Sequence, residues 1–276
     1  MSAIGLGAMP MSVEGRPDRE RSIATVHAAL DAGVTLIDTA DAYHLGPEDI
    51  GHNESLIADA LAARGADAAD VLIATKGGHL RPGGGVWTLD GRPEHLRAAC
   101  EESLRRLGVE SIGLYQFHRP DPEVPYEESV GALAVLLDEG KIQAAGISNA
   151  DPAQIRLARE ILGGRLASVQ NQFSPGFRSS EAELELCGEL DIAFLPWSPL
   201  GGISGASALA DRHAAFAEVA KAHGVSPQQV CLAWMLAKGP HVVPIPGSSR
   251  PETIRDSAAA VTLELSPEEL DRLDAQ

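Results

Sequence analysis

Short apolar runs alternate with amphipathic stretches along the whole chain. The runs are residues 3–8, 34–38, 71–76, 112–117, 142–147, 166–169, 192–195 and 241–245. Between them, the spacing of apolar residues predicts helices, such as one with Ile23, Val26 and Leu30 on one face and one begun by Asp151 and Pro152. Strands that alternate with helices form parallel sheets through right-handed crossovers. Eight such units predict a closed (β/α)8 barrel, with residues 1–276 as a single domain.

An open, doubly wound sheet is the alternative fold for this pattern. It is disfavoured because no Gly-x-Gly-x-x-Gly opens a helix after the first run, and Gly83–Gly85 has no helix directly behind it. Three local features are also expected. Asn53 caps a helix, residues 77–92 form a long glycine-rich loop, and residues 201–205 form a second glycine-rich loop.

The composition, with 44% hydrophobic and 22% charged residues, is that of a soluble globular protein. A net charge of −17 argues against a nucleic acid or an anionic membrane as partner. No leader and no apolar run long enough to span a membrane is evident. Cys100, Cys187 and Cys231 lie far apart without metal-ligand spacing, which indicates buried thiols in a reducing compartment. We therefore expect a cytoplasmic protein without a metal site.

Polar residues follow three successive apolar runs. Asp38, Lys76 and His118 end the second, third and fourth runs, and Tyr43 follows Asp38 by five residues. Each has an ordinary explanation alone, but a barrel brings the carboxyl ends of its strands to one face. There the four could donate a proton to a carbonyl, because a nearby ammonium lowers the pKa of a tyrosine from about 10. Asp38 would hold Lys76, His118 would donate or relay a proton, and a cofactor would supply hydride.

These residues and several motifs resemble the aldo-keto reductase family over essentially the whole chain. The motifs are Gly5-Leu6-Gly7-Ala8-Met9, Gly146-Ile147-Ser148-Asn149, Val169-Gln170-Asn171-Gln172, Trp197-Ser198-Pro199-Leu200 and Ile245-Pro246-Gly247-Ser248. The resemblance implies an NADP(H)-dependent carbonyl reductase on a (β/α)8 barrel, with Tyr43 as general acid assisted by Lys76, Asp38 and His118. Many relatives begin with a hairpin that plugs the barrel bottom, and this chain is expected to lack it.

The resemblance also implies a dinucleotide site. Trp197 stands where the family usually stacks a tyrosine on the nicotinamide ring, and Ser198 and Leu200 match contacts to the pyrophosphate. The residues that match the holders of the carboxamide are Ser148, Asn149 and Gln170. The full set of expected cofactor contacts is Gly7, Ala8, Met9, Asp38, Ser148, Asn149, Gln170, Trp197, Ser198, Pro199, Leu200, Gly201, Ile245, Gly247, Ser248, Ser249, Arg250 and Asp256.

The segment before the helix at Pro251 also has a physical interpretation of its own. Backbone N–H groups and hydroxyls at a helix N-terminus, with Arg250 beside them, suit a phosphate monoester. This predicts that NADP(H) is preferred over NAD(H). The alternative is that Ser248 and Ser249 only cap the helix.

Residues near the predicted acid suggest a substrate pocket for a small carbonyl compound. Its expected members are Met9, Tyr43, Trp87, His118 and Arg119. Trp87 could instead only hold its own loop, and Arg119 could form a surface salt bridge instead of binding an anionic substrate. The remaining nearby histidines are expected to be loop or cap residues: His44, His52 and His79.

The leading hypothesis is therefore the reduction of an aldehyde or ketone with NADPH. Three alternatives stay open: a dehydrogenase that mainly oxidises a sugar or alcohol, a lyase with Lys76 as Schiff-base nucleophile, and a cofactor-binding regulatory barrel. The sequence identifies neither the substrate nor the oligomeric state.

Overall fold

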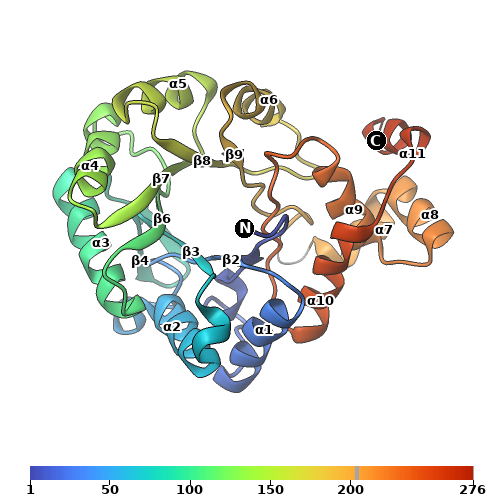
Figure 1. Cartoon of the computed structure of the whole chain (residues 1–276), viewed down its shortest axis with the longest axis horizontal. Helices are drawn as coiled ribbons and strands as arrows, with labels where there is room; N and C mark the ends of the chain where they lie inside the picture. The colour runs from blue at the N-terminus through green and yellow to red at the C-terminus, as the bar shows by residue number, and fades with distance from the viewer. Residues whose placement is uncertain (203–204, 276) are drawn as a thin grey trace.

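The computed structural model describes residues 1–202 and 205–275 and shows a ring of parallel strands enclosed by helices (Figure 1). Seven strands form one sheet in sequence order: β1 (Leu6–Gly7), β2 (Leu36–Asp38), β3 (Leu72–Gly77), β6 (Ile112–Phe117), β7 (Ile142–Ser148), β8 (Leu166–Gln170) and β9 (Ala193–Phe194). Every pair of neighbours in this sheet is parallel. The carboxyl ends of the strands therefore meet on one face, as the alternating pattern predicts.

The ring closes through residues 241–247, between β9 and β1. Isolated parallel bridges join Phe194 to Val242 on one side and Gly7 to Gly247 on the other. The expectation of a regular strand at residues 241–245 is wrong, because Pro244 and the following Pro246 have no N–H to continue a ladder. The prediction of a (β/α)8 barrel is confirmed, with its eighth side made by these bridges.

Helices surround the sheet. They are α1 (Arg19–Asp31), α2 (His52–Arg64), α3 (Pro93–Leu107), α4 (Tyr126–Asp138), α5 (Pro152–Ile161), α6 (Glu181–Leu190), α9 (Pro227–Leu236) and α10 (Pro251–Ala259). Three more lie to one side of the ring in Figure 1: α7 (Leu209–Arg212), α8 (Ala214–His223) and α11 (Pro267–Asp274). The predicted cap of α5 is confirmed, since Asp151 accepts from the backbone of Gln154 and the Gln154 side chain returns a bond.

The expected role of Asn53 as an N-cap is wrong. Helix α2 begins one residue earlier, at His52, and the Asn53 side chain is fully buried. Its amide donates to the Ala8 carbonyl at 2.9 Å and to the Ser12 hydroxyl at 2.7 Å, and its oxygen accepts from the Thr39 hydroxyl at 2.6 Å. Asn53 therefore ties the segment after β1 to the residue that follows Asp38.

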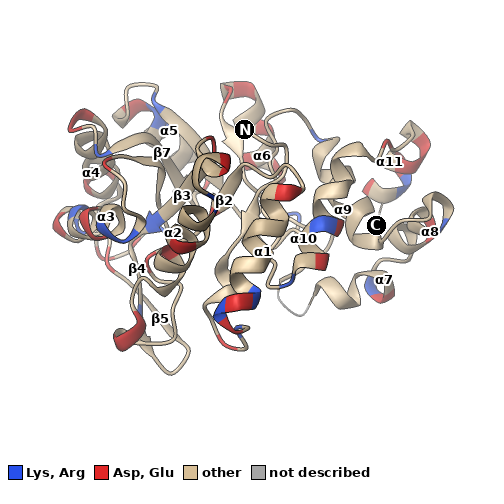
Figure 2. Cartoon of the chain, turned by 60° about the horizontal axis from the view of Figure 1, so that its bottom comes forward, with Lys and Arg blue, Asp and Glu red and all other residues tan. Residues whose placement is uncertain are grey.

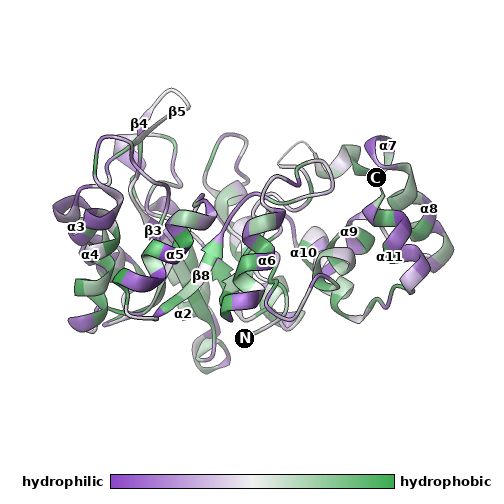
Figure 3. Ribbon diagram, turned by 90° about the horizontal axis from the view of Figure 1, so that it is seen from above, coloured by the Kyte–Doolittle hydropathy of each residue, from purple (hydrophilic) through white to green (hydrophobic). Residues whose placement is uncertain are grey.

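Residues 77–92 are not the irregular loop that their glycines suggest. They contain an antiparallel hairpin of β4 (His79–Gly83) and β5 (Val86–Leu89). Its turn runs through Gly83–Gly85, all with positive φ, a conformation that glycine adopts without strain. Figures 2 and 3 show the hairpin and the N-terminus at opposite ends of the barrel. The hairpin places His79 and Trp87 over the carboxyl ends of the strands.

The distribution of side chains follows the barrel architecture. Figure 3 shows mostly apolar strands and polar outer faces on the helices, while Figure 2 shows lysine and arginine scattered singly among acidic residues. The three cysteines are free and buried, as predicted for small core residues. Of the helices in the described ranges, none is long and apolar enough to cross a membrane.

Candidate active site

Asp38, Tyr43 and Lys76 meet above the carboxyl end of β2. The Lys76 ammonium donates to Asp38 Oδ2 at 2.7 Å, to the Thr39 carbonyl at 2.8 Å and to the Tyr43 hydroxyl at 3.2 Å. All of these side chains are buried, and Lys76 is 0% exposed. The predicted bridge from Asp38 through Lys76 to Tyr43 is thus present as a chain of direct contacts.

The backbone explains this meeting. Asp38 lies beside Ala74 in the β2–β3 register, so Lys76, two residues further along β3, points to the same side of the sheet. After β2 the chain turns, with the Tyr43 N–H donating to the Ala40 carbonyl at 3.3 Å. Asp38 is also held across the barrel by Gln170, whose amide donates to Oδ1 at 2.8 Å.

The environment of Tyr43 corrects one expectation. Burial raises the pKa of its hydroxyl, and the charge of Lys76 opposes that shift without cancelling it. The sequence-based expectation of a lowered pKa is therefore wrong in direction. Burial alone would lower the pKa of Lys76, but the Asp38 carboxylate and Tyr43 raise it on balance. Near neutral pH, Tyr43 keeps its proton and Lys76 its charge.

His118 follows β6 and lies beside Tyr43. The ring centroids of Tyr43 and His118 are 5.7 Å apart, with the ring planes nearly perpendicular. The ring centroids of His79 and His118 are 4.0 Å apart. Burial, then the charges of His79, Lys76 and Arg119, hold the pKa of His118 well below its usual range. The imidazole is therefore neutral and can donate one N–H to an oxygen held at Tyr43.

These residues line one end of a cavity of about 1040 Å³. All the expected cofactor contacts line it except Ala8 and Gly201, and so do the five expected substrate residues. Ala8 is buried, and its carbonyl accepts from Asn53. In the expected loop 201–205, Gly202 lines the cavity, while residues 203 and 204 lie outside the described part of the chain. Lys76 lies behind the cavity wall, out of reach of a ligand.

The middle of the cavity carries the predicted nicotinamide contacts. Asn149 donates to the His118 carbonyl at 3.0 Å, and the Ser148 hydroxyl donates to the Gln170 carbonyl at 2.6 Å. Asn149 and Ser198 have φ of 58° and 51°, a left-handed conformation that costs a non-glycine residue roughly 1–2 kcal/mol. Such strain is typical of functional sites. The indole N–H of Trp197 is buried without a partner among the described residues.

The far end of the cavity lies at the start of α10. Ser248 to Arg250 line it, and the Arg250 side chain is 55% exposed, 3.9 Å from a Glu252 oxygen. The Ser248 hydroxyl is engaged with the Arg250 carbonyl and with Thr253, so this serine does stabilise the turn before the helix. Asp256 is held by Ser226 and a neighbouring glutamine at 2.6–2.7 Å.

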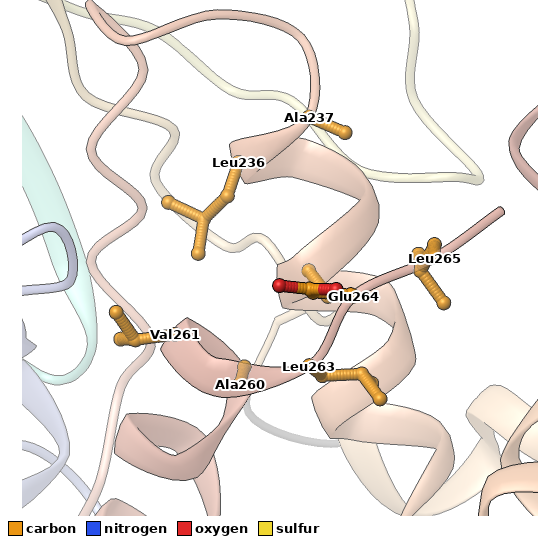
Figure 4. A pocket seen from close by; sticks show the side chains of 8 residues that line it. Leu236, Ala237, Ala260, Val261, Leu263, Glu264 and Leu265 are labelled. Carbon is orange, nitrogen blue, oxygen red and sulfur yellow. The ribbon is translucent and has the colours of Figure 1, made fainter. Parts of the chain in front are cut away.

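Several residues that line the cavity were not predicted from the sequence. His79, Thr88 and Leu89 come from the hairpin, and Ser226 and Gln228 come from the start of α9. The run Val86–Leu89 after three glycines is the signal that would have identified the hairpin. A second, smaller hollow of about 380 Å³ lies between α9 and residues 260–265 (Figure 4). Its lining is apolar except for one glutamate, and none of the predicted site residues reaches it.

Comparisons with known proteins identify the family of the chain. The model of the aldo/keto reductase family matches residues 3–276. An uncharacterized oxidoreductase of Schizosaccharomyces pombe is 35% identical, with 100% of this chain and 87% of that protein covered. A probable aldo-keto reductase of Glycine max is also 35% identical, over 98% of this chain and 84% of that protein.

Solved structures give the same result. A glycerol dehydrogenase of Gluconobacter oxydans is similar with a TM-score of 0.84 and 28% identity, covering 100% of this chain and 91% of that chain. An aldo/keto reductase of Klebsiella pneumoniae in complex with NADP and acetate has a TM-score of 0.81 and 29% identity over the same shares. The chain belongs to the aldo/keto reductase family, whose members are NADP-dependent oxidoreductases.

Proposed function

We propose that this protein reduces an aldehyde or ketone to the alcohol with NADPH, with Tyr43 as the general acid. The observation that carries the proposal is the Lys76 ammonium, in contact with both Asp38 and the Tyr43 hydroxyl at the floor of the large cavity. The same cavity continues to Arg250, so one groove can hold both a carbonyl compound and a dinucleotide.

Tyr43 donates the proton to the carbonyl oxygen. Because burial keeps its pKa high, the hydroxyl is protonated at neutral pH and available as a donor. An alkoxide is a stronger base than a phenolate, so the transfer becomes favourable as negative charge develops on the oxygen. Lys76 stabilises the phenolate that remains, and Asp38 holds Lys76 in position. Neutral His118 donates a hydrogen bond to the same oxygen and orients it.

The residues present fit the dinucleotide that the family uses. Trp197 offers an apolar face and an indole N–H without a partner among the described residues, and Asn149 lines the same cavity. Ser249 and Arg250 at the N-terminus of α10 suit a phosphate. One N–H of the Gln170 amide is given to Asp38, which leaves its oxygen and its second N–H for a carboxamide. When bound, the cofactor supplies the hydride. We further propose that Arg250 makes NADPH the preferred form.

Oxidation of an alcohol is the second candidate, favoured by the similarity to a glycerol dehydrogenase. It needs Tyr43 as phenolate, and the raised pKa makes that form scarce at neutral pH. A Schiff-base lyase is disfavoured because Lys76 is charged and does not line the cavity. A cofactor-binding regulatory barrel would bind NADPH without turnover. The cytosolic location remains a prediction from the sequence.

The test is Tyr43→Phe, assayed with NADPH and a panel of aldehydes, quinones and keto-sugars. We expect kcat to fall by about 10²–10⁴, while quenching of NADPH fluorescence on binding is unchanged. Full activity in this variant would refute the assignment of the acid. NADPH binding without turnover by the wild-type protein on the whole panel would favour the regulatory barrel.

A further inference from the structure

The catalytic end of the cavity has a charge balance unlike that of the whole chain. The protein carries 39 acidic against 22 basic residues. Above the Tyr43 hydroxyl, however, the described lining residues include no carboxylate besides Asp38, which is paired with Lys76. We call this region the catalytic end; its members are Met9, Tyr43, His79, Trp87, Leu89, His118 and Arg119. Arg119 is its one charged residue apart from that pair.

Arg119 has no acidic partner among the described residues, although acids are abundant elsewhere. Its guanidinium donates to Asn149 Oδ1 at 3.1 Å, which fixes it beside the cavity. The alternative from the sequence, a surface salt bridge of Arg119, is not formed in the described part of the chain, because no carboxylate there lies within 4 Å of the guanidinium. The Asn149 bond uses one terminal nitrogen and leaves other N–H donors of the fork available.

The charge of Arg119 affects the pKa of both histidines at the catalytic end. Burial is the main reason that the pKa of His79 is lowered to about 4 and that the pKa of His118 lies well below its usual range, and the charges of Arg119 and Lys76 lower both further. Both imidazoles are therefore neutral, and no local negative charge offsets the guanidinium. Arg119 is itself exposed, so its charge faces solvent as well as the cavity. A cleft that carries one cation without an acidic partner concentrates anions at that position. Met9, Trp87 and Leu89 supply apolar surface in the lining of the same cavity.

We propose that the substrate is a carbonyl compound that also carries a carboxylate, with the carboxylate on Arg119 and the carbonyl oxygen at Tyr43. This inference rests on the proposed reduction. Arg119 directly follows His118, so a short apolar spacer separates the two groups of the substrate. Arginine is suited to this task because its fork matches the two oxygens of a carboxylate.

The first experiment compares 4-carboxybenzaldehyde with its methyl ester, which has the same spacer and no charge. The wild-type protein should have a higher kcat/KM for the acid than for the ester. Arg119→Gln should lose about 10- to 100-fold in kcat/KM for the acid, as expected for a charge-assisted hydrogen bond, and little for the ester. Arg119→Lys should keep part of the preference. Arg165→Gln, which removes the same charge from a surface pair with Asp138, is the control and should change neither.

The second experiment measures binding without turnover, by calorimetric titration of the full-length protein with benzoate. Wild type should bind benzoate, and Arg119→Gln should bind it at least about tenfold more weakly. The proposal is overturned if the ratio of kcat/KM for the acid to kcat/KM for the ester is the same in Arg119→Gln as in wild type. It is also overturned if the variant binds NADPH more weakly and loses kcat/KM equally on both aldehydes. If neither aldehyde is reduced by wild type, the reductase assignment fails for these compounds, and the benzoate titration alone decides the role of Arg119.

Discussion

Replacing Lys76 by methionine tests the central arrangement most directly. The change removes the ammonium that contacts Asp38, Thr39 and Tyr43 but keeps much of the side-chain volume. Asp38 would then be a buried carboxylate whose remaining side-chain donors are Gln170 at 2.8 Å and Gln116 at 3.5 Å. We expect both the stability of the fold and kcat for reduction to fall.

The loss of stability follows from burial. Lys76 and Asp38 are 0% and 4% exposed in their side chains, so water does not screen the pair. At 2.7 Å the attraction is about 6 kcal/mol for an effective dielectric of about 20. Desolvation of both ions offsets part of it, and breaking a buried pair typically costs about 3–5 kcal/mol. For a chain of this size that lowers the melting temperature by on the order of 10 °C.

The rate should fall because Tyr43 loses the charge that stabilises its phenolate. We expect kcat for reduction to fall by about 10²–10⁴, measured at saturating NADPH. The double variant Lys76→Met/Asp38→Asn separates the two effects, since it removes the uncompensated charge. It should recover much of the lost melting temperature and none of the lost rate. If Lys76→Met keeps both wild-type stability and wild-type kcat, or if the double variant recovers the rate, the reasoning is wrong.

Three further changes probe the cofactor end, the scaffold and pH. Arg250→Ala should weaken NADPH binding about tenfold and NADH binding hardly at all. Glu252→Gln should strengthen NADPH binding, because it removes the carboxylate beside Arg250. Equal effects of Arg250→Ala on both cofactors would show that Arg250 does not contact the phosphate. Asn53→Ala should lower the free energy of unfolding in urea by about 2–4 kcal/mol because it leaves buried partners unsatisfied. The folded-state pKa of His79, about 4, lies below the unfolded value of 6.5, so the unfolded chain takes up the proton first. Stability should therefore fall from pH 6.5 towards 4 by at most about 1.4 kcal/mol per pH unit from this group, and urea unfolding of His79→Gln should show a smaller loss.

Part of this site could be predicted because it depends only on the spacing of the apolar runs and on the order of the strands in the barrel. The ends of apolar runs in a parallel barrel fall on one face, whatever the packing, so Asp38, Lys76 and His118 could be placed together from the sequence. The hairpin at 79–89 was missed because three successive glycines resemble a loop, although they are what its tight turn requires.

Other features depend on contacts that no local pattern contains. Asn53 matches a helix cap in sequence, yet its partners Ala8 and Ser12 lie 45 and 41 residues away. The pKa of Tyr43 is raised because the whole fold buries it, and the proximity of Lys76 alone suggests the opposite sign. Whether Arg119 has an acidic partner also depends on the fold, which places no carboxylate of the described residues within ion-pair distance of it.

Gln170 connects two features that were predicted separately from the sequence: the group that holds Lys76 and the expected carboxamide contact. Its amide N–H holds Asp38 Oδ1, and Asp38 Oδ2 holds Lys76, so Gln170 contributes, together with the Thr39 carbonyl, to holding the charge beside Tyr43. The Gln170 oxygen and the second N–H of its amide are left for the carboxamide of the proposed cofactor. A cofactor held there would fix the side chain that aligns Asp38, and cofactor binding would thereby order the proton donor. A glutamate at position 170 would lose the N–H and place a second carboxylate against Asp38, which explains why an amide suits this position.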